Sequence, residues 1–227
     1  MPESPPMSTT AGKIPDHRLS PIRGAYLIAD RTRLGAEGLE PAVRAALEGG
    51  AALVQYRDKS DDAERRLAEA RSLAELCHAH GALLVVNDDP ALARQAGADG
   101  VHLGRGDVGV AEARKILGEE AIVGVSCYNR LERALAAQRE GADYVAFGSF
   151  YPSPTKPEAV RAPLALLRRA RALLDLPIVA IGGVTPDNAG PLALAGADAA
   201  AVISGVLDAD DITEATRRLR NLMRLHW

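Results

Sequence analysis

Residues 177–206, PIVAIGGVTPDNAGPLALAGADAAAVISGV, contain the pattern that decides the fold. Two short apolar runs, 177–181 and 199–203, are each followed closely by glycine, and residues 186–194 between them are expected to form a short helix. A strand, a helix and a second strand in this order form a unit in which the two strands pair in parallel. Near-continuous apolar strands are typical of a parallel sheet that helices cover.

The same unit recurs along the chain from Gly24 onward. The apolar runs with strand character lie at 25–29, 52–56, 82–86, 100–103, 122–126, 144–147, 177–181 and 199–203. The helical stretches include 62–78, 112–117, 131–140, 163–173, 186–194 and 213–223. Eight such units in about 200 residues predict an α/β protein that is a single small (β/α)8 TIM barrel. The alternative is a doubly wound open sheet, but its usual GxGxxG fingerprint is absent from the sequence.

A small turn motif precedes several of these strands. It is EGGA at 48–51, AGAD at 96–99, GAD at 141–143 and AGAD at 195–198. Glycine adopts the left-handed conformation that ends many helices, and it does so without steric cost. The uneven spacing indicates one helix-to-strand turn used several times rather than a repeat protein.

The composition excludes several classes of function. The 227 residues include 27 Lys and Arg and 30 Asp and Glu, which gives a formal net charge of −3. This balance does not provide the basic surface that nucleic-acid binding requires. Aromatic residues make up only 4% of the chain, too few for a platform on which bases stack. We therefore expect small-molecule partners and no nucleic acid.

The sequence also predicts a compartment and a domain layout. Cys77 and Cys127 have no spacing typical of a metal site or a disulfide framework, which favours a reducing compartment. No apolar run is long enough to span a membrane, and the N-terminus lacks a signal-peptide pattern. We expect a cytoplasmic protein without membrane contact, and a homo-oligomer is compatible with the sequence. Residues 1–21, rich in proline, are expected to be a disordered leader before a barrel domain at 22–227.

In a (β/α)8 barrel, the chemistry lies at the carboxyl ends of the strands. At the end of the second run, Gln55, Arg57 and Lys59 share one face because side chains alternate along a strand. If this face points into the mouth of the barrel, it brings an amide and two cations together, where an anionic ligand would compensate the charges. The alternative is a solvated strand end whose cations pair with Asp58 or Asp61.

Two carboxylates follow the third and fourth runs. Asp89, just before Pro90, is suited to cap the next helix, which leaves Asp88 for another role. Asp107 lies in a tight glycine-containing loop at the end of the neighbouring strand. Mg²⁺ binds one or two carboxylates and completes its coordination with water and phosphate oxygens. The pair therefore predicts a magnesium site.

Three further residues lie at the ends or in the interior of the strands. Ser126 can donate a hydrogen bond to a phosphate group. Cys127 has no histidine or acid placed to activate it in the sequence, so we do not expect a nucleophile. His102 lies inside the fourth run and is expected to be a core histidine with satisfied hydrogen bonds.

The later loops carry groups suited to phosphate. Prolines stiffen the loop at 152–157, in which Ser153, Thr155 and Lys156 supply two hydroxyls and an ammonium group. Glycine-rich loops, including Gly183, follow the seventh and eighth runs and lie next to a short helix, which is the usual phosphate site of this barrel class.

Together these segments resemble the thiamine-phosphate synthase family, and the similarity extends from Gly24 to Leu222. The matching segments are QYRDK (55–59), NDDPALA (87–93), GADGVHLGRGD (97–107), GVSCYN (124–129), GADYVAFGSFYPSPTKP (141–157), PIVAIGGVTPDN (177–188) and AGADAAAVISGV (195–206). Members of this family join a hydroxymethylpyrimidine diphosphate to a thiazole phosphate, carboxylated or not, and release pyrophosphate. The resemblance implies this activity, and Mg²⁺ as the cofactor.

The resemblance also implies a set of site residues. The substrate-binding residues are Gln55, Tyr56, Arg57, Asp58, Lys59, Asn87, Ser126, Ser153, Pro154, Thr155, Lys156, Gly183, Ile203 and Ser204. Of these, Arg57, Lys59, Ser126 and Lys156 are implied to be catalytic, and Asp88 and Asp107 are the implied Mg²⁺ ligands. The family reaction passes through a pyrimidine carbocation and needs no general base, so catalysis is by electrostatics and positioning. Tyr26 and Phe147 are the candidates to flank the pyrimidine ring.

Two alternative functions remain. A thiazole tautomerase shares the barrel and the phosphate site, but its relatives place a histidine where this chain has Tyr128. A non-catalytic phosphate-sensing barrel would retain Gly183 and Ser204 but has no need for Asp88, Asp107 and Lys156 together.

Overall fold

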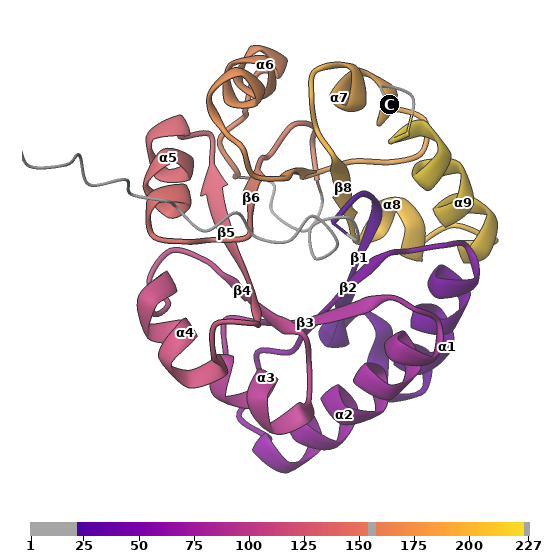
Figure 1. Cartoon of the computed structure of the whole chain (residues 1–227). Coiled ribbons are helices and arrows are strands. Elements are labelled where there is room, and N and C mark those ends of the chain that lie inside the picture. The colour runs from indigo at the N-terminus through magenta and orange to yellow at the C-terminus, as the bar shows by residue number, and fades with distance from the viewer. Residues whose placement is uncertain (1–21, 154–157, 225–227) are drawn as a thin grey trace, which may run out of the picture.

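The computed structural model describes residues 22–153 and 158–224, and the leader expected at 1–21 lies outside these ranges. Eight strands pair in parallel and in chain order, and β8 pairs with β1, so the sheet is a closed barrel. This confirms the predicted (β/α)8 TIM barrel. Figure 1 shows the barrel end-on, with the helices arranged around the outside of the strands.

The strands lie close to the predicted runs. They are β1 (Gly24–Asp30), β2 (Leu53–Arg57), β3 (Leu83–Asn87), β4 (Gly100–Leu103), β5 (Ile122–Tyr128), β6 (Tyr144–Phe147), β7 (Ile178–Ile181) and β8 (Ala199–Val202). The helices are α1 (Arg31–Glu48), α2 (Ala63–Ala79), α3 (Pro90–Ala96), α4 (Val110–Leu117), α5 (Leu131–Arg139), α6 (Leu164–Leu173), α7 (Gly190–Leu194), α8 (Ser204–Leu207) and α9 (Ile212–Leu222). Strands β4 and β6 have the predicted bounds, whereas α7 begins four residues later than its predicted stretch at 186–194. None of the helices in the described ranges has the length and apolarity needed to cross a membrane.

The core has two layers, separated by the wall of strands. Tyr26 and Ile28 belong to the smaller cluster of buried side chains, which fills the interior of the barrel. Leu27 and Ala29, which alternate with them along β1, belong to the larger cluster between the strands and the helices. Because successive side chains of a strand point to opposite faces, each strand contributes to both layers.

The recurring GAD turn joins the ends of neighbouring strands at the base of the barrel. Its glycines, Gly97, Gly141 and Gly196, have φ of 70°, 87° and 104°, the left-handed region expected for them. The aspartate of each turn then accepts a hydrogen bond of 2.7 Å from a backbone N–H at the start of the preceding strand. The pairs are Asp99 with Leu84, Asp143 with Val123 and Asp198 with Ile178.

A cationic or ring-nitrogen partner contacts each of these aspartates. The nitrogen-to-oxygen distances are 3.0 Å for His78 to Asp99, 2.8 Å for Arg114 to Asp143 and 3.2 Å for Arg171 to Asp198. Each aspartate therefore satisfies a strand N–H on one side and, on the other, contacts the helix that leads into that strand, which is α2, α4 or α6. This role explains why the turn carries aspartate as well as glycine, which its sequence alone did not indicate.

We predict that Asp198→Ala lowers the free energy of unfolding by about 2–4 kcal/mol, because it leaves the buried N–H of Ile178 without an acceptor and removes the carboxylate that pairs with Arg171. Urea denaturation measures this change. The control is Asp187→Ala, which removes an exposed carboxylate paired with Arg218 and should cost less than about 0.5 kcal/mol. Equal effects of the two substitutions would show that the turn aspartates are not structural.

Candidate active site

The predicted site residues of β2 divide between the two faces of the strand. Gln55 Nε2 donates to the hydroxyl of Tyr26 in the barrel interior, at 2.6 Å. Arg57, two residues further on, forms an ion pair with Asp30 at the end of β1. Both side chains therefore face the inside of the barrel, as the alternation along β2 predicts.

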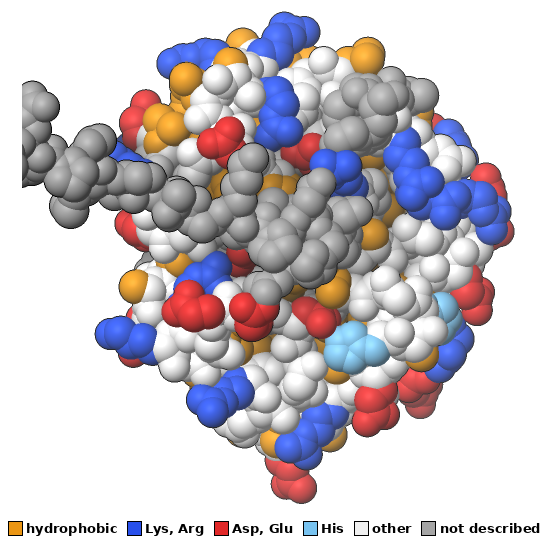
Figure 2. Space-filling view, in the orientation of Figure 1, with side chains coloured by type: hydrophobic (Ala, Val, Ile, Leu, Met, Phe, Trp, Pro, Cys, Tyr) orange, Lys and Arg blue, Asp and Glu red, His pale blue; other side chains and the backbone are white. Residues whose placement is uncertain are grey.

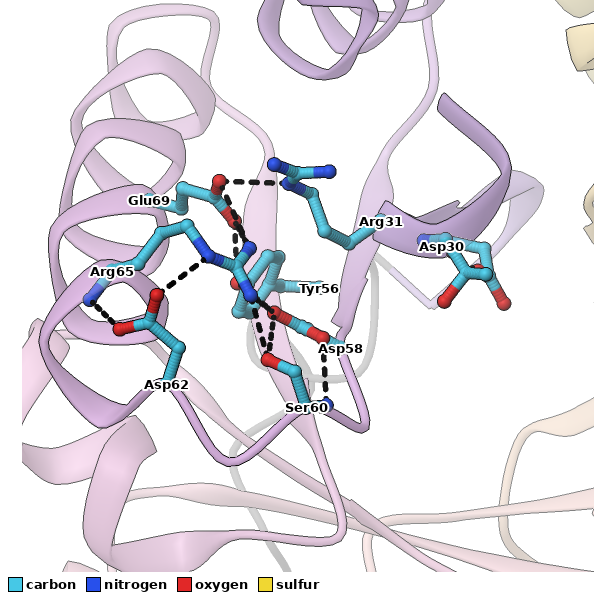
Figure 3. Close-up of polar contacts among 9 residues, drawn as sticks. Asp30, Arg31, Tyr56, Asp58, Ser60, Asp62, Arg65 and Glu69 are labelled. Carbon is cyan, nitrogen blue, oxygen red and sulfur yellow. Dashed lines mark hydrogen bonds and ion pairs between the residues drawn. The ribbon is translucent and has the colours of Figure 1, made fainter. Parts of the chain in front are cut away.

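Tyr56 and Asp58 point to the other face, toward α2 (Figure 3). The Tyr56 hydroxyl donates to Glu69 Oε2 at 2.7 Å, and the Asp58 carboxylate lies 2.9 Å from an Arg65 nitrogen. Burial acts to raise the pKa of Asp58, but hydrogen bonds from Ser60 and the charge of Arg65 outweigh it and hold the pKa below its ordinary value. The predicted substrate contacts at Tyr56 and Asp58 can thus come only from their backbone, because their side chains fasten the strand end to α2.

Asp30 is a site residue that the sequence analysis missed. Its carboxylate caps α1 by accepting from the backbone N–H groups of Thr32 and Arg33, at 3.1 and 3.3 Å. The parallel register places it directly beside Arg57, and the Arg57 side chain donates to its other oxygen. The signal available in the sequence was an aspartate directly after the apolar run at 25–29.

The two predicted metal ligands meet in the structure. The backbone N–H of Gly104 donates to Asp107 Oδ2 at 2.6 Å, and a β-carbon at this glycine would lie 3.1 Å from that oxygen and 3.9 Å from Asp88 Oδ1. The two carboxylates therefore lie close to each other, and Lys59 Nζ is 3.2 Å from Asp88 Oδ2. Asp88 itself has φ of 66°, an uncommon value for a residue with a side chain.

The environment separates the pKa values of the two carboxyl groups. For Asp88, burial is opposed by hydrogen bonds from Asp107, Lys59 and Asn87, and the pKa is lowered. For Asp107, burial and the neighbouring Asp88 charge outweigh the Gly104 hydrogen bond, and the pKa is raised. Two carboxylates this close repel each other when both are ionised, and a divalent cation between them relieves that repulsion. The donor set therefore fits Mg²⁺.

Ser126, His102 and Cys127 lie where the sequence placed them. Both ring nitrogens of His102 are hydrogen-bonded at 2.9 Å, one to Ser126 Oγ and one to the hydroxyl of Tyr144. His102 is therefore a core histidine with satisfied nitrogens, as predicted. The Cys127 thiol is fully buried, and burial raises its pKa to about 12, so a reactive thiolate is not available at neutral pH.

Close backbone contacts join the loops after β6, β7 and β8. Gly183 has φ of 64°, and a β-carbon there would lie 2.2 Å from the carbonyl oxygen of Pro152. At Gly205, in the first turn of α8, a β-carbon would lie 2.0 Å from the carbonyl oxygen of Val184. These contacts bring Gly183, Ser204 and Ser153 to one side of the mouth. Pro154, Thr155 and Lys156, which are also predicted to bind substrate, lie outside the described residues.

One of the two ring candidates is wrong. Tyr26 lies in the barrel interior, but Phe147 is buried in the outer layer, between the strands and the helices. The alternation along β6 sends Tyr144 to the interior instead.

Among the described side chains visible in Figure 2, charges of both signs are mixed on this face of the barrel. Lys59 and Asp88 form one such local pair. The closed barrel places this chain in the class of (β/α)8 barrels, in which glycine-rich loops after the seventh and eighth strands often form a phosphate site.

Comparisons with known proteins identify the family within this class. A family model described as thiamine monophosphate synthase matches residues 25–206. A thiamine-phosphate synthase from Nitrosococcus oceani is 56% identical over 201 residues, which cover 88% of this chain and 93% of that protein. Another from Chromobacterium violaceum is 58% identical over 203 residues, covering 87% and 95%. A solved structure of thiamine phosphate pyrophosphorylase from Pyrococcus furiosus has a TM-score of 0.82 at 38% identity, covering 90% of this chain and 97% of that one. The chain belongs to the thiamine monophosphate synthase family, and it is an enzyme.

We predict that Gly183→Ala lowers the free energy of unfolding by more than about 1 kcal/mol, because alanine is strained at this φ and its β-carbon would meet the Pro152 carbonyl. The control is Gly190→Ala, at the start of α7, where a β-carbon meets no atom within 4 Å. That substitution should leave stability unchanged or raise it by up to about 1 kcal/mol. Urea denaturation of both variants measures the difference, and a tolerated Gly183→Ala would contradict the close approach of the two loops.

Proposed function

We propose that this enzyme joins 4-amino-2-methyl-5-(diphosphooxymethyl)pyrimidine to a thiazole phosphate, and so forms thiamine phosphate and pyrophosphate. The observation that carries the proposal is the contact of Lys59 with the neighbouring carboxylates Asp88 and Asp107, at the strand end that also carries Arg57. Two cations next to a carboxylate pair suit a diphosphate with its metal ion. The family to which the chain belongs supports the same reaction.

The reaction needs charge stabilisation more than proton transfer. The bond from the pyrimidine methylene carbon to the diphosphate oxygen breaks, and its electron pair leaves with pyrophosphate. The lone pair of the thiazole nitrogen then forms the new C–N bond, so no base is required. Arg57, Lys59 and the Ser126 hydroxyl are the described groups suited to stabilise the departing oxygens, with Lys156 as a further cation from the adjoining loop.

Asp88 and Asp107 are the residues that we propose to hold Mg²⁺. Within residues 22–153 and 158–224 there is no group of three or more His, Cys, Asp or Glu side chains placed to hold a metal. A site with two carboxylates leaves the other coordination positions to water and phosphate oxygens, which is the usual arrangement for Mg²⁺. When bound, the ion neutralises part of the diphosphate charge.

The thiazole phosphate is proposed to bind on the opposite side of the mouth. The backbone of Gly183, Ile203 and Ser204 offers N–H groups for its phosphate, and Ser153 and Thr155 add hydroxyls from the loop after β6. Asn87, which interacts with Asp88 at the end of β3, is proposed to orient the pyrimidine ring between the two sides.

The tautomerase alternative finds little support at Tyr128. The guanidinium groups of Arg105 and Arg133 lie 4.9 and 5.6 Å from the centre of its ring, and its hydroxyl accepts from the backbone N–H of Arg105. The contacts with two guanidinium groups indicate that Tyr128 has a structural role. A base for proton transfer must instead be free to accept a proton from the substrate.

The direct test mixes the purified enzyme, Mg²⁺ and both substrates and measures pyrophosphate and thiamine phosphate. We expect both products in equal amounts, and their loss when a chelator removes the metal. Isomerised thiazole formed without the pyrimidine would favour the tautomerase. Binding of phosphate without formation of any product would favour the non-catalytic phosphate-sensing barrel.

A second prediction concerns the carboxylate pair. Asp88→Ala and Asp107→Ala should each lower kcat by at least about 100-fold, because each removes a proposed metal ligand. The matched control is Asp89→Ala, which removes the neighbouring cap of α3 and should cost stability but leave kcat near its original value. Unchanged turnover in both test variants would reject the metal assignment.

A further inference from the structure

A chain of buried hydrogen bonds crosses the interior of the barrel between two predicted site residues. It starts at Gln55 Nε2, 2.6 Å from the Tyr26 hydroxyl, which lies 3.0 Å from the Tyr144 hydroxyl. Tyr144 lies 2.9 Å from His102 Nδ1, and His102 Nε2 lies 2.9 Å from Ser126 Oγ. The chain thus connects β2 to β5 through β1, β6 and β4.

The barrel is built around this chain. Tyr26 is 1% exposed and Tyr144 is 0% exposed, and the two rings meet edge to face with centres 6.1 Å apart. Gly124 makes the space for Tyr144, because a β-carbon there would lie 2.0 Å from a carbon of the Tyr144 ring. Polar groups buried this deeply are costly unless each one finds a partner.

The donors in the chain have a single consistent direction. The Gln55 amide nitrogen can only donate, so the Tyr26 oxygen accepts from it. Tyr26 has no further hydrogen-bond partner among the described residues, so its own proton goes to Tyr144. Tyr144 must then donate to His102 Nδ1, and the imidazole proton lies on Nε2 and is donated to Ser126. Burial raises the pKa of both tyrosines, so each keeps its one proton at neutral pH.

The direction of the chain sets what its two ends offer a ligand. At one end, the Gln55 nitrogen is held by Tyr26, so the side-chain carbonyl remains as an acceptor. At the other end, Ser126 Oγ accepts from His102, so its own proton remains as a donor. In the register of the strands, Gln55 stands beside Ile28, two residues closer to the carboxyl end of β1 than Tyr26. Ser126 likewise stands two residues beyond Gly124, which pairs with His102.

We propose that Tyr26, Tyr144 and His102 are positioning residues, whose one-way hydrogen-bond chain makes Gln55 an acceptor and Ser126 a donor at the mouth. The proposal rests on the proposed function for its ligand. An aminopyrimidine has hydrogen-bond donors only on its exocyclic amine, which matches an acceptor at Gln55, and its diphosphate oxygens match a donor at Ser126. A pyrimidine with a carbonyl in place of the amine meets an acceptor with an acceptor. The chain therefore determines specificity for the amino form of the ring.

The first test determines the direction of the hydrogen-bond chain in the protein without substrate. Nitrogen-15 NMR of the histidine-labelled full chain at about pH 8, above the usual histidine pKa of about 6.5, distinguishes protonated from bare ring nitrogens. His102→Gln identifies the signal by removing it. We expect the proton on Nε2 and a bare Nδ1. A proton on Nδ1 would mean that Ser126 donates to the ring, and it would overturn the proposal.

The second test reads specificity. It compares kcat/KM for the pyrimidine diphosphate with the inhibition constant of its 4-oxo analogue in wild type and in Tyr26→Phe. Without the Tyr26 oxygen, the Gln55 amide is free to rotate and to present its nitrogen to the carbonyl. We expect the preference for the amino form to fall by about tenfold, the size of one hydrogen bond to a fixed partner. An unchanged preference would overturn the proposal.

The control is Tyr151→Phe. This substitution also removes a tyrosine hydroxyl, which donates to the backbone carbonyl oxygen of Asn188 at 2.8 Å and takes no part in the buried hydrogen-bond chain. The variant should keep both the His102 tautomer and the preference for the amino form. If wild type makes no thiamine phosphate at all, the proposed function fails, while the NMR result still decides whether the chain runs from Gln55 to Ser126.

Discussion

Closure of eight parallel strands into a barrel is the constraint on which the other features depend, because it forces every strand side chain to face either the interior or the helices. The end of β2 shows the consequence most clearly. Gln55 and Arg57 face the interior and the mouth, while Tyr56 and Asp58 bind Glu69 and Arg65 of α2. The outer side chains fix the position of the strand end, and the inner ones carry the chemistry.

The sequence predicted the fold well because barrels are built from local units. The apolar runs at 100–103 and 144–147 match β4 and β6 to the residue, since glycine or aspartate bounds each of them. Helix α1 was harder to recognise, because Gly35 interrupts its helical backbone and Pro41 lies inside it. The meeting of Asp88 and Asp107 could also be predicted, because neighbouring parallel strands bring their carboxyl ends to the same edge.

Other features needed the register of the strands, which the sequence alone does not supply. Phe147 and Tyr144 differ by three positions, so they face opposite sides of β6, but only the structure shows which of them is inside. The pairing of Asp30 with Arg57 likewise depends on how β1 aligns with β2. The sequence does not show why position 124 carries glycine. The structure shows that a side chain there would collide with the ring of Tyr144.

The net charge of the predicted site is less positive than a count of its cations suggests, because carboxylates pair with both Arg57 and Lys59. Asp30 already neutralises much of Arg57 and holds its guanidinium in place beside the mouth, so this cation is oriented before a diphosphate arrives. Lys59 contacts Asp88, one of the two carboxylates that we propose as metal ligands. A carboxylate that shares a divalent cation has less charge left for an ammonium group, so metal binding at Asp88 would release Lys59 toward the diphosphate. Binding of the metal and binding of the diphosphate would then favour each other, because tighter metal binding at Asp88 would leave Lys59 more available to the leaving group.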